Sequence, residues 1–284
     1  MLKKIFGLAP TLEPDGSYSP SKLALKMSTS QKTNYDNATY QAYTGARKKI
    51  LILCTEQKNM PMKNGKQFST GNHPVETFLP MMHLKSAGFE FTIVTPTGKP
   101  AILEMWAMPN GDQPVMDFYH EHKSQFHNPG SLKDFVANSL AEHESYAAIY
   151  VPGGHGSMLG IPEDENVDKL LRWADQNDLY TITLCHGPGS LLATASNGQE
   201  FLYKGYEMAA FPDAVDKQTP MIGYLPGPMP WHLEAKLTEL GAVIVNKKMD
   251  ETTHIDRKLI TGASPLASNE LGKLSAKTLL ANLT

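Results

Sequence analysis

The chain has 284 residues, of which 41% are hydrophobic, and this suits one large domain or one domain with an appendage. Its formal net charge of −3 and its scattered Lys and Arg residues give no basic surface that would attract nucleic acid, and binding of that kind is not expected. No apolar run approaches the roughly 20 residues that cross a bilayer. We therefore expect a soluble cytoplasmic protein with no membrane partner, and its two cysteines, Cys54 and Cys185, do not make a disulfide framework.

The first 46 residues are polar and rich in turn-forming residues. Their basic start has too short an apolar run for a signal peptide. Four tyrosines, Tyr18, Tyr35, Tyr40 and Tyr43, are spread through them and favour an ordered arm that lies on a surface over a flexible tail.

Strands and helices are predicted to alternate from residue 48 onward. The predicted strands are 50–54, 89–95, 146–151, 180–184, 242–245 and 258–261. The predicted helices are 75–82, 167–174, a helix-like run from 190, 233–240 and 271–279. This alternation indicates an α/β fold in which a parallel sheet is covered by helices on both faces.

Residues 97 to 145 interrupt the alternation and are interpreted as an insertion. We predict a core made of residues 46–96 and 141–284. The N-terminal arm (1–45) and the insertion (97–140) would together make a small accessory domain.

Ligands of such sheets bind at the carboxyl ends of the strands. The loops after Cys54, Val151 and Leu184 lie at that edge, and the last of them contains Cys185. A strand that turns sharply into a helix exposes the side chain at the junction, and the helix N-terminus favours a thiolate there. We therefore predict that Cys185 is a nucleophile with a lowered pKa, although a buried cysteine can also be a small core residue.

The neighbours of Cys185 suggest acid–base partners. His186 could act as a base, although side chains at consecutive positions diverge and it need not touch the sulfur. An aspartate could orient His186, and spacing leaves Asp213 and Asp216 equally good, with a capping role open to either.

Two further segments could face the same edge. Glu76, in the first turn of a predicted helix, is either a partner of the helix dipole or a buried carboxyl that moves a proton. Gly153 and Gly154 follow a strand, and their amides could stabilise an oxyanion together with the amide of His186, or they could form an ordinary turn.

A metal site receives less support from the residues themselves. His120, His122 and His127 cluster in the insertion, and Glu90 lies on a predicted strand. Solvated surface histidines are the favoured interpretation.

Five segments, in this order and spacing, resemble the bacterial heat-shock protein 31 family within the PfpI-like superfamily. They are FSTGNHPVE (68–76), EMWAMP (104–109), VPGGHG (151–156), LCHGP (184–188) and FPDAVDKQTP (211–220). The resemblance runs from about residue 45 to the C-terminus. Members of that family are described as glyoxalase III, protein deglycase and molecular chaperone.

The resemblance implies a flavodoxin-like core and a homodimer. It implies that Cys185 is the nucleophile, that His186 and Asp216 complete a triad-like set, and that Glu76 lies beside the thiol; it thereby selects Asp216 over Asp213. Two positions of the family's metal site are Glu90 and His122, but the third is Lys85, whose charged amine is not a ligand. A zinc site is therefore not expected unless His83 or His120 substitutes, and no cofactor is required.

The expected activity is cofactor-independent conversion of methylglyoxal, or another 2-oxoaldehyde, into D-lactate through a cysteine hemithioacetal. The same thiol could act on glycated proteins or nucleotides. The alternatives are a holdase chaperone that binds unfolded proteins, which could coexist with catalysis, and a cysteine amidase or peptidase. The adjacency of Cys185 and His186 argues against the amidase, because a classical base reaches the thiol from across the site.

Overall fold

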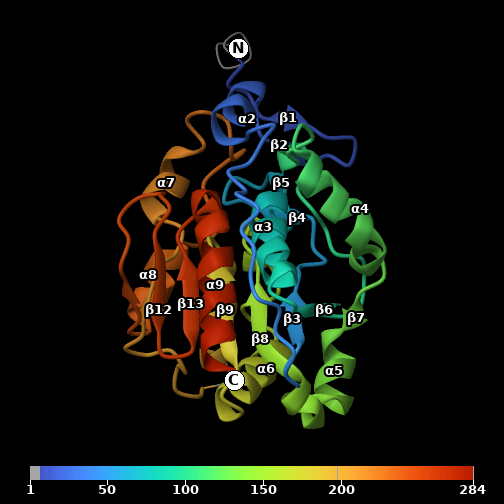
Figure 1. Cartoon of the computed structure of the whole chain (residues 1–284). Coiled ribbons are helices and arrows are strands. Elements are labelled where there is room, and N and C mark those ends of the chain that lie inside the picture. The colour runs from blue at the N-terminus through green and yellow to red at the C-terminus, as the bar shows by residue number, and fades with distance from the viewer. Residues whose placement is uncertain (1–6, 197, 284) are drawn as a thin grey trace.

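The computed structural model describes residues 7–196 and 198–283, and the first six residues of the predicted arm lie outside this range, as does Thr284. A seven-stranded sheet forms its centre (Figure 1). In spatial order the strands are β12 (Thr253–Asp256), β13 (Leu259–Gly262), β9 (Tyr180–Leu184), β8 (Tyr146–Val151), β3 (Lys49–Leu53), β6 (Glu90–Thr95) and β7 (Gly130–Ser131). All neighbouring pairs are parallel except β12 and β13. The predicted α/β class is confirmed.

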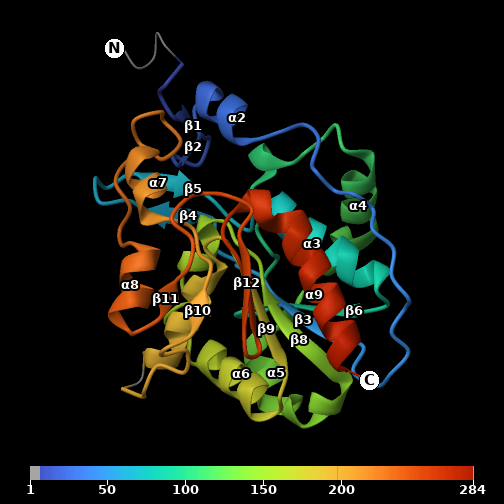
Figure 2. The same cartoon turned by 60° about the vertical axis from the view of Figure 1, so that its left-hand side comes forward.

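Helices cover both faces of this sheet (Figures 1 and 2). Ile50 and Ile52 of β3 pack with α3 (Pro74–Ser86), α4 (Gln113–His127) and α9 (Ser268–Asn282). Leu51 and Leu53 point the other way and pack with α5 (Leu132–Asn138), α6 (Glu165–Gln176) and α8 (Leu233–Glu239). Because successive side chains of a strand alternate between faces, a continuous apolar run such as 50–53 fills two cores at once.

A second, smaller sheet lies near the end of the molecule at which the N-terminal segment is drawn (Figure 1). Its order is β1 (Thr11–Leu12), β2 (Tyr18–Ser19), β5 (Gln67–Ser69) and β4 (Asn59–Pro61). The short helix α2 (Lys22–Ser28) follows β2, and Ser21 caps its N-terminus by accepting a hydrogen bond from the Ala24 amide. The strands of the arm therefore pair with a segment that follows β3.

Two predicted elements take a different form. The predicted strand 242–245 becomes β11 (Val243–Ile244), which pairs with β10 (Glu207–Met208) in a separate two-stranded sheet. The run after Cys185 is a 3-10 helix, η4 (Gly187–Ala195), and not an α-helix. The other short elements are α7 (Asp213–Gln218), η1 (Met105–Ala107), η2 (Leu140–Ser145), η3 (His155–Met158) and η5 (Pro265–Ala267).

The described part of the N-terminal arm is ordered against the core, as its tyrosines predicted. The Tyr40 hydroxyl lies 2.9 Å from Nδ1 of His83, and the Tyr43 ring stacks on Phe89. The insertion contributes α4, which covers α3, and also β7 of the central sheet. The division into a core and an accessory domain stays a prediction. Within the described residues, no helix is both long and apolar enough to span a membrane.

Candidate active site

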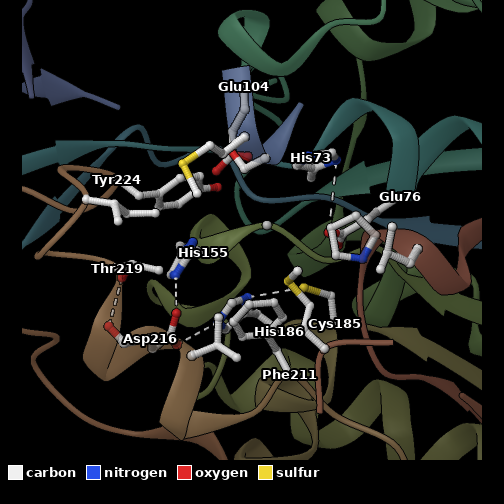
Figure 3. A pocket seen from close by; sticks show the side chains of 18 residues that line it. His73, Glu76, Glu104, His155, Cys185, His186, Phe211, Asp216, Thr219 and Tyr224 are labelled. Atoms are coloured by element: carbon white, nitrogen blue, oxygen red, sulfur yellow. Dashed lines mark hydrogen bonds and ion pairs between the residues drawn. The ribbon is translucent and has the colours of Figure 1, made fainter. Parts of the chain in front are cut away.

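A cavity of about 270 Å³ opens at the carboxyl ends of β8 and β9 (Figure 3). Its walls carry all four side chains that the sequence suggested for catalysis: Cys185, His186, Asp216 and Glu76. They come from segments far apart in the chain: the junction after β9, the helix α7 and the first turn of α3. The predicted location at the strand ends follows from the parallel order of β3, β8 and β9.

Cys185 lies at a sharp turn between β9 and η4. Its φ is 60°, which is left-handed and costs a residue with a side chain about 1–2 kcal/mol. Its N–H donates to the Gly262 carbonyl (2.8 Å), and its own carbonyl accepts from the Phe211 amide (2.9 Å). Neighbouring strands and loops thus hold a strained residue in place, which is common at functional sites.

The Cys185 sulfur and the His186 ring contact each other, so the expectation that consecutive side chains diverge is wrong. Sγ lies 3.4 Å from Nδ1, and the ring's Nε2 lies 2.9 Å from Oδ2 of Asp216. The left-handed backbone at Cys185 permits this approach. Since a carboxylate accepts from Nε2–H, Nδ1 of a neutral His186 is an acceptor that faces the thiol. Phe211 stacks on the ring with centroids 4.5 Å apart.

The structure places Asp216, and not Asp213, against His186. Asp213 instead accepts hydrogen bonds from the backbone amides of Glu234 (2.9 Å) and Ala235 (3.0 Å). Its carboxylate therefore satisfies two free N–H groups at the start of α8. The choice that spacing left open is decided by these contacts.

His155 is a site residue that the residue-by-residue reasoning missed. Its Nε2 lies 3.0 Å from Oδ1 of Asp216, and its ring lies over that of His186 with centroids 4.0 Å apart. One carboxylate therefore orients two imidazoles. The available signal was the position of His155, two residues after Gly153 in the loop that follows β8, at the same sheet edge as Cys185.

Charge is distributed unequally over these three groups. Burial acts to raise the pKa of Asp216, but the two imidazoles hold it below its usual range. Burial lowers the pKa of His186, and repulsion from His155 lowers it further. Burial opposes a charge on His155 too, yet Asp216 and Glu104 leave its pKa raised. His186 is consequently the neutral imidazole that can take a proton from the thiol.

Glu76 lies on the other side of the sulfur and is 1% exposed. A Cβ atom at Gly153 would lie 1.9 Å from its Oε2 and 2.7 Å from Cβ of Cys185, so only glycine lets the three groups approach. No donor lies in hydrogen-bonding geometry to Oε2 of Glu76. His73, 4.0 Å from Oε1, has a pKa lowered to about 3 by burial and by the two site histidines, so it does not neutralise Glu76.

The predicted lowering of the Cys185 pKa is wrong. Burial raises the pKa of the thiol, and a negative charge on Glu76 would raise it further; the His186 amide acts in the opposite direction but is weaker. Burial also raises the pKa of Glu76 well above its ordinary value. This shift favours the protonated form of Glu76, and the thiol ionises when a neighbouring base takes its proton.

The backbone amides suggested for an oxyanion lie close to the reacting groups. Gly154, with a φ of 98°, directs its amide toward the Glu76 carboxyl, and the His186 amide is directed toward the Cys185 sulfur. The Gly153 carbonyl accepts from the His73 amide at 3.0 Å, which fixes the loop. These amides could stabilise an oxyanion beside the sulfur.

In the part of the chain that the structure describes, Glu90 and His122 do not belong to a cluster of side chains close enough together to hold a metal. Lys85 pairs with Glu121, and Nδ1 of His122 donates to the Phe118 carbonyl (2.9 Å). His83, suggested as a substitute, has both ring nitrogens in contact with other side chains, Tyr40 and Asn269. Within the described residues only His155, His186 and Asp216 come close enough to hold a metal, and their mutual hydrogen bonds already account for that arrangement.

Curated relatives match nearly the whole chain. It is 46% identical over 267 residues to "Protein/nucleic acid deglycase HchA" of Escherichia coli O1:K1, covering 94% of this chain and 93% of the relative. The match to "Protein/nucleic acid deglycase 1" of Escherichia coli K12 has the same identity and coverage. No protein-family model matches the chain.

Solved structures of lower sequence identity share the fold. Rapid Encystment Protein 24 kDa of Francisella tularensis is 22% identical with a TM-score of 0.69, covering 82% of this chain and 99% of that one. Glyoxalase III of Candida albicans is 20% identical with a TM-score of 0.63, covering 82% and 96%.

Proposed function

The chain belongs to the family of the HchA protein/nucleic acid deglycases, and we propose that it is an enzyme of that kind, acting on methylglyoxal and its adducts through the Cys185 thiol. The family resemblance inferred from the five motifs is thereby confirmed. The observation that carries the proposal is the contact between Cys185, His186 and Asp216 in a buried cavity that the Glu76 carboxyl also lines.

The reaction with methylglyoxal begins as His186 takes the thiol proton through Nδ1 and the sulfur adds to the aldehyde carbon. The resulting hemithioacetal has its oxygen close to the amides of Gly154 and His186. Removal of the C1 proton gives an enediol, and addition of a proton at C2 gives the thioester of lactate, with His186 and Glu76 as the groups that move these protons. Water then cleaves the thioester, and D-lactate and the free thiol are released.

Deglycation differs from the reaction of free methylglyoxal only in how the hemithioacetal forms. The sulfur forms its bond to C1 of the hemiaminal, the C–N bond breaks, and the amine leaves with one proton. The hemithioacetal is the same in both cases, so the later steps are shared. The net reaction adds one water and yields the amine and lactate. No external thiol and no redox cofactor enters this balance.

Release of D-lactate from methylglyoxal, with no added thiol, tests this proposal. Cys185→Ala should abolish it while the far-UV circular dichroism spectrum stays unchanged. Cys54→Ala is the matched control, because Cys54 is equally buried but lies outside the cavity, and it should retain activity. Full turnover by Cys185→Ala would contradict the proposal.

The family resemblance implies a homodimer, the composition favours a cytoplasmic location, and a holdase activity would be indifferent to Cys185→Ala. The argument against an amidase, that an adjacent histidine cannot serve the thiol, fails because Sγ and Nδ1 are 3.4 Å apart. Turnover of fluorogenic aminopeptides that depends on Cys185 would support the amidase.

A further inference from the structure

The cavity contains a second buried carboxyl group, that of Glu104, which the proposed reaction does not use. In Figure 3 Glu104 and Tyr224 lie on the side of the cavity away from Cys185 and His186. Glu104 is 1% exposed, and its segment is fixed by a hydrogen bond from its amide to the Asn72 carbonyl (3.0 Å). The insertion thus supplies one wall of the site.

One carboxyl oxygen of Glu104 is engaged and the other is not. Oε1 accepts from the Thr70 hydroxyl at 2.6 Å, whereas Oε2 is buried without any partner. Burial raises the pKa of Glu104 to about 7. Because buried polar atoms in folded proteins are nearly always hydrogen-bonded, an unpaired oxygen on a cavity wall points to a ligand group that completes it.

The surroundings of Glu104 indicate which ligand group this is. Its neighbour Tyr224, half-buried, has a pKa raised by burial and next by Glu104, so the phenol remains a neutral hydroxyl. His155 and Glu104 also act on each other electrostatically, since each favours the charged form of the other, but Nε2 of His155 is already hydrogen-bonded to Asp216. The Thr70 hydroxyl and the Gly71 amide both favour the charged form of this carboxyl group, yet Oε2 itself has no donor in hydrogen-bonding geometry.

Substrates differ in whether they bring that donor. Free methylglyoxal carries two carbonyl oxygens, which only accept hydrogen bonds. An adduct with a guanidine adds several N–H donors and a positive charge in a planar array that matches a carboxylate. A positive charge beside Glu104 also favours its ionised form.

We propose that Glu104 is a specificity-determining residue, whose free oxygen binds the guanidinium N–H groups of a methylglyoxal–arginine adduct while the adduct's C1 carbon lies at Cys185. The proposal rests on the proposed function for the chemistry at Cys185. The recognition itself needs only the cavity wall, so binding can be measured without turnover.

The binding test uses methylguanidinium as the probe and the Cys185→Ala protein, by calorimetry. Adding Glu104→Gln should weaken binding tenfold or more, since a charge-assisted hydrogen bond is lost. Adding Glu121→Gln, which removes an equal charge at the surface, should leave binding unchanged. If Glu104→Gln does not fold, Glu104→Asp keeps the charge but retracts it, and it should also bind more weakly. Binding as tight as that of the parent in a folded Glu104 variant would overturn the proposal.

A kinetic test separates recognition from a structural role. The measured quantity is kcat/KM for release of Nα-acetylarginine from its methylglyoxal adduct, above spontaneous release, divided by kcat/KM for free methylglyoxal. Glu104→Gln should lower this ratio at least tenfold. An equal fall of both values would show that Glu104 only supports the fold. Full D-lactate formation by Cys185→Ala would refute the proposed reaction. The calorimetric result would still decide whether Glu104 binds a guanidinium group, because that measurement involves no turnover.

Discussion

Replacing Asp216 by Asn removes the acceptor that two imidazoles share. Only one of the two side-chain positions of an asparagine accepts a hydrogen bond, whereas Oδ1 and Oδ2 of Asp216 now contact His155 and His186 at 3.0 and 2.9 Å. If the amide nitrogen faces His186, the ring must carry its proton on Nδ1. That proton then points at the Cys185 sulfur, and the base is lost.

The expected magnitude follows from the charge and the tautomer together. Unit charges about 3 Å apart attract by about 5 kcal/mol at the effective dielectric of a protein interior, which sets the ceiling for stabilising a protonated His186. A mispositioned acid–base group costs roughly a hundred- to ten-thousand-fold in rate. We therefore expect kcat/KM for D-lactate formation to fall by about that factor in Asp216→Asn.

Asp213→Asn is the matched control for this assay. Asp213 lies in the same short helix but accepts two hydrogen bonds from the start of α8, and an asparagine can accept only one of them. The variant should therefore lower the free energy of unfolding by about 1 kcal/mol and leave kcat/KM near the wild-type value. Activity of Asp216→Asn within tenfold of wild type, in a folded protein, would refute the role assigned to Asp216. So would an equal loss in both variants.

The other predictions concern the carboxyl and the loop beside the sulfur. Glu76→Gln should lower kcat for D-lactate formation by roughly a hundred- to ten-thousand-fold, because a neutral amide does not shuttle protons, and near-normal turnover would exclude that role. Gly153→Ala should lower both activity and the melting temperature, since its Cβ would lie 1.9 Å from Oε2 of Glu76, and an active, equally stable variant would show that the loop does not hold the carboxyl in place. The third prediction concerns stability in acid. The pKa of His73 is about 6.5 in the unfolded chain and about 3 in the folded protein, so the unfolded chain binds the proton more readily. The free energy of unfolding should therefore fall as the pH drops from 6.5 toward 3. His73→Asn should flatten that slope by about one proton in chemical denaturation, and an unchanged slope would contradict the burial of a neutral ring.

Much of the fold is readable from local pattern. The apolar runs at 50–53 and 146–151 become fully buried parallel strands because each must fill cores on two faces, and the sequence shows this directly. The segment 242–245 shows the limit. Its strand character is local, but its pairing with β10 depends on where distant chain segments lie.

The site is readable only in part for the same reason. Cys185 stands out because a strand ends there abruptly. Its contact with His186, however, depends on a left-handed φ, and a cysteine in the sequence does not predict that conformation. The lowered pKa inferred from the helix N-terminus failed because burial, a property of the whole fold, is stronger than the dipole of a 3-10 turn. Glu104 and His155 reach the cavity only because the fold brings their segments next to Cys185, and no local sequence pattern predicts this.

The proposed reaction depends most on a covalent bond between Cys185 and the aldehyde carbon of the substrate. Native mass spectrometry of Glu76→Gln, shortly after mixing with methylglyoxal, tests this bond directly, because the hemithioacetal should accumulate when its proton transfer is slowed. We expect the mass of Glu76→Gln to increase by one methylglyoxal. The same increase should appear when Cys54→Ala is added to Glu76→Gln, and it should disappear when Cys185→Ala is added. D-lactate formation without any such adduct, or an adduct that survives Cys185→Ala, would contradict the proposed reaction.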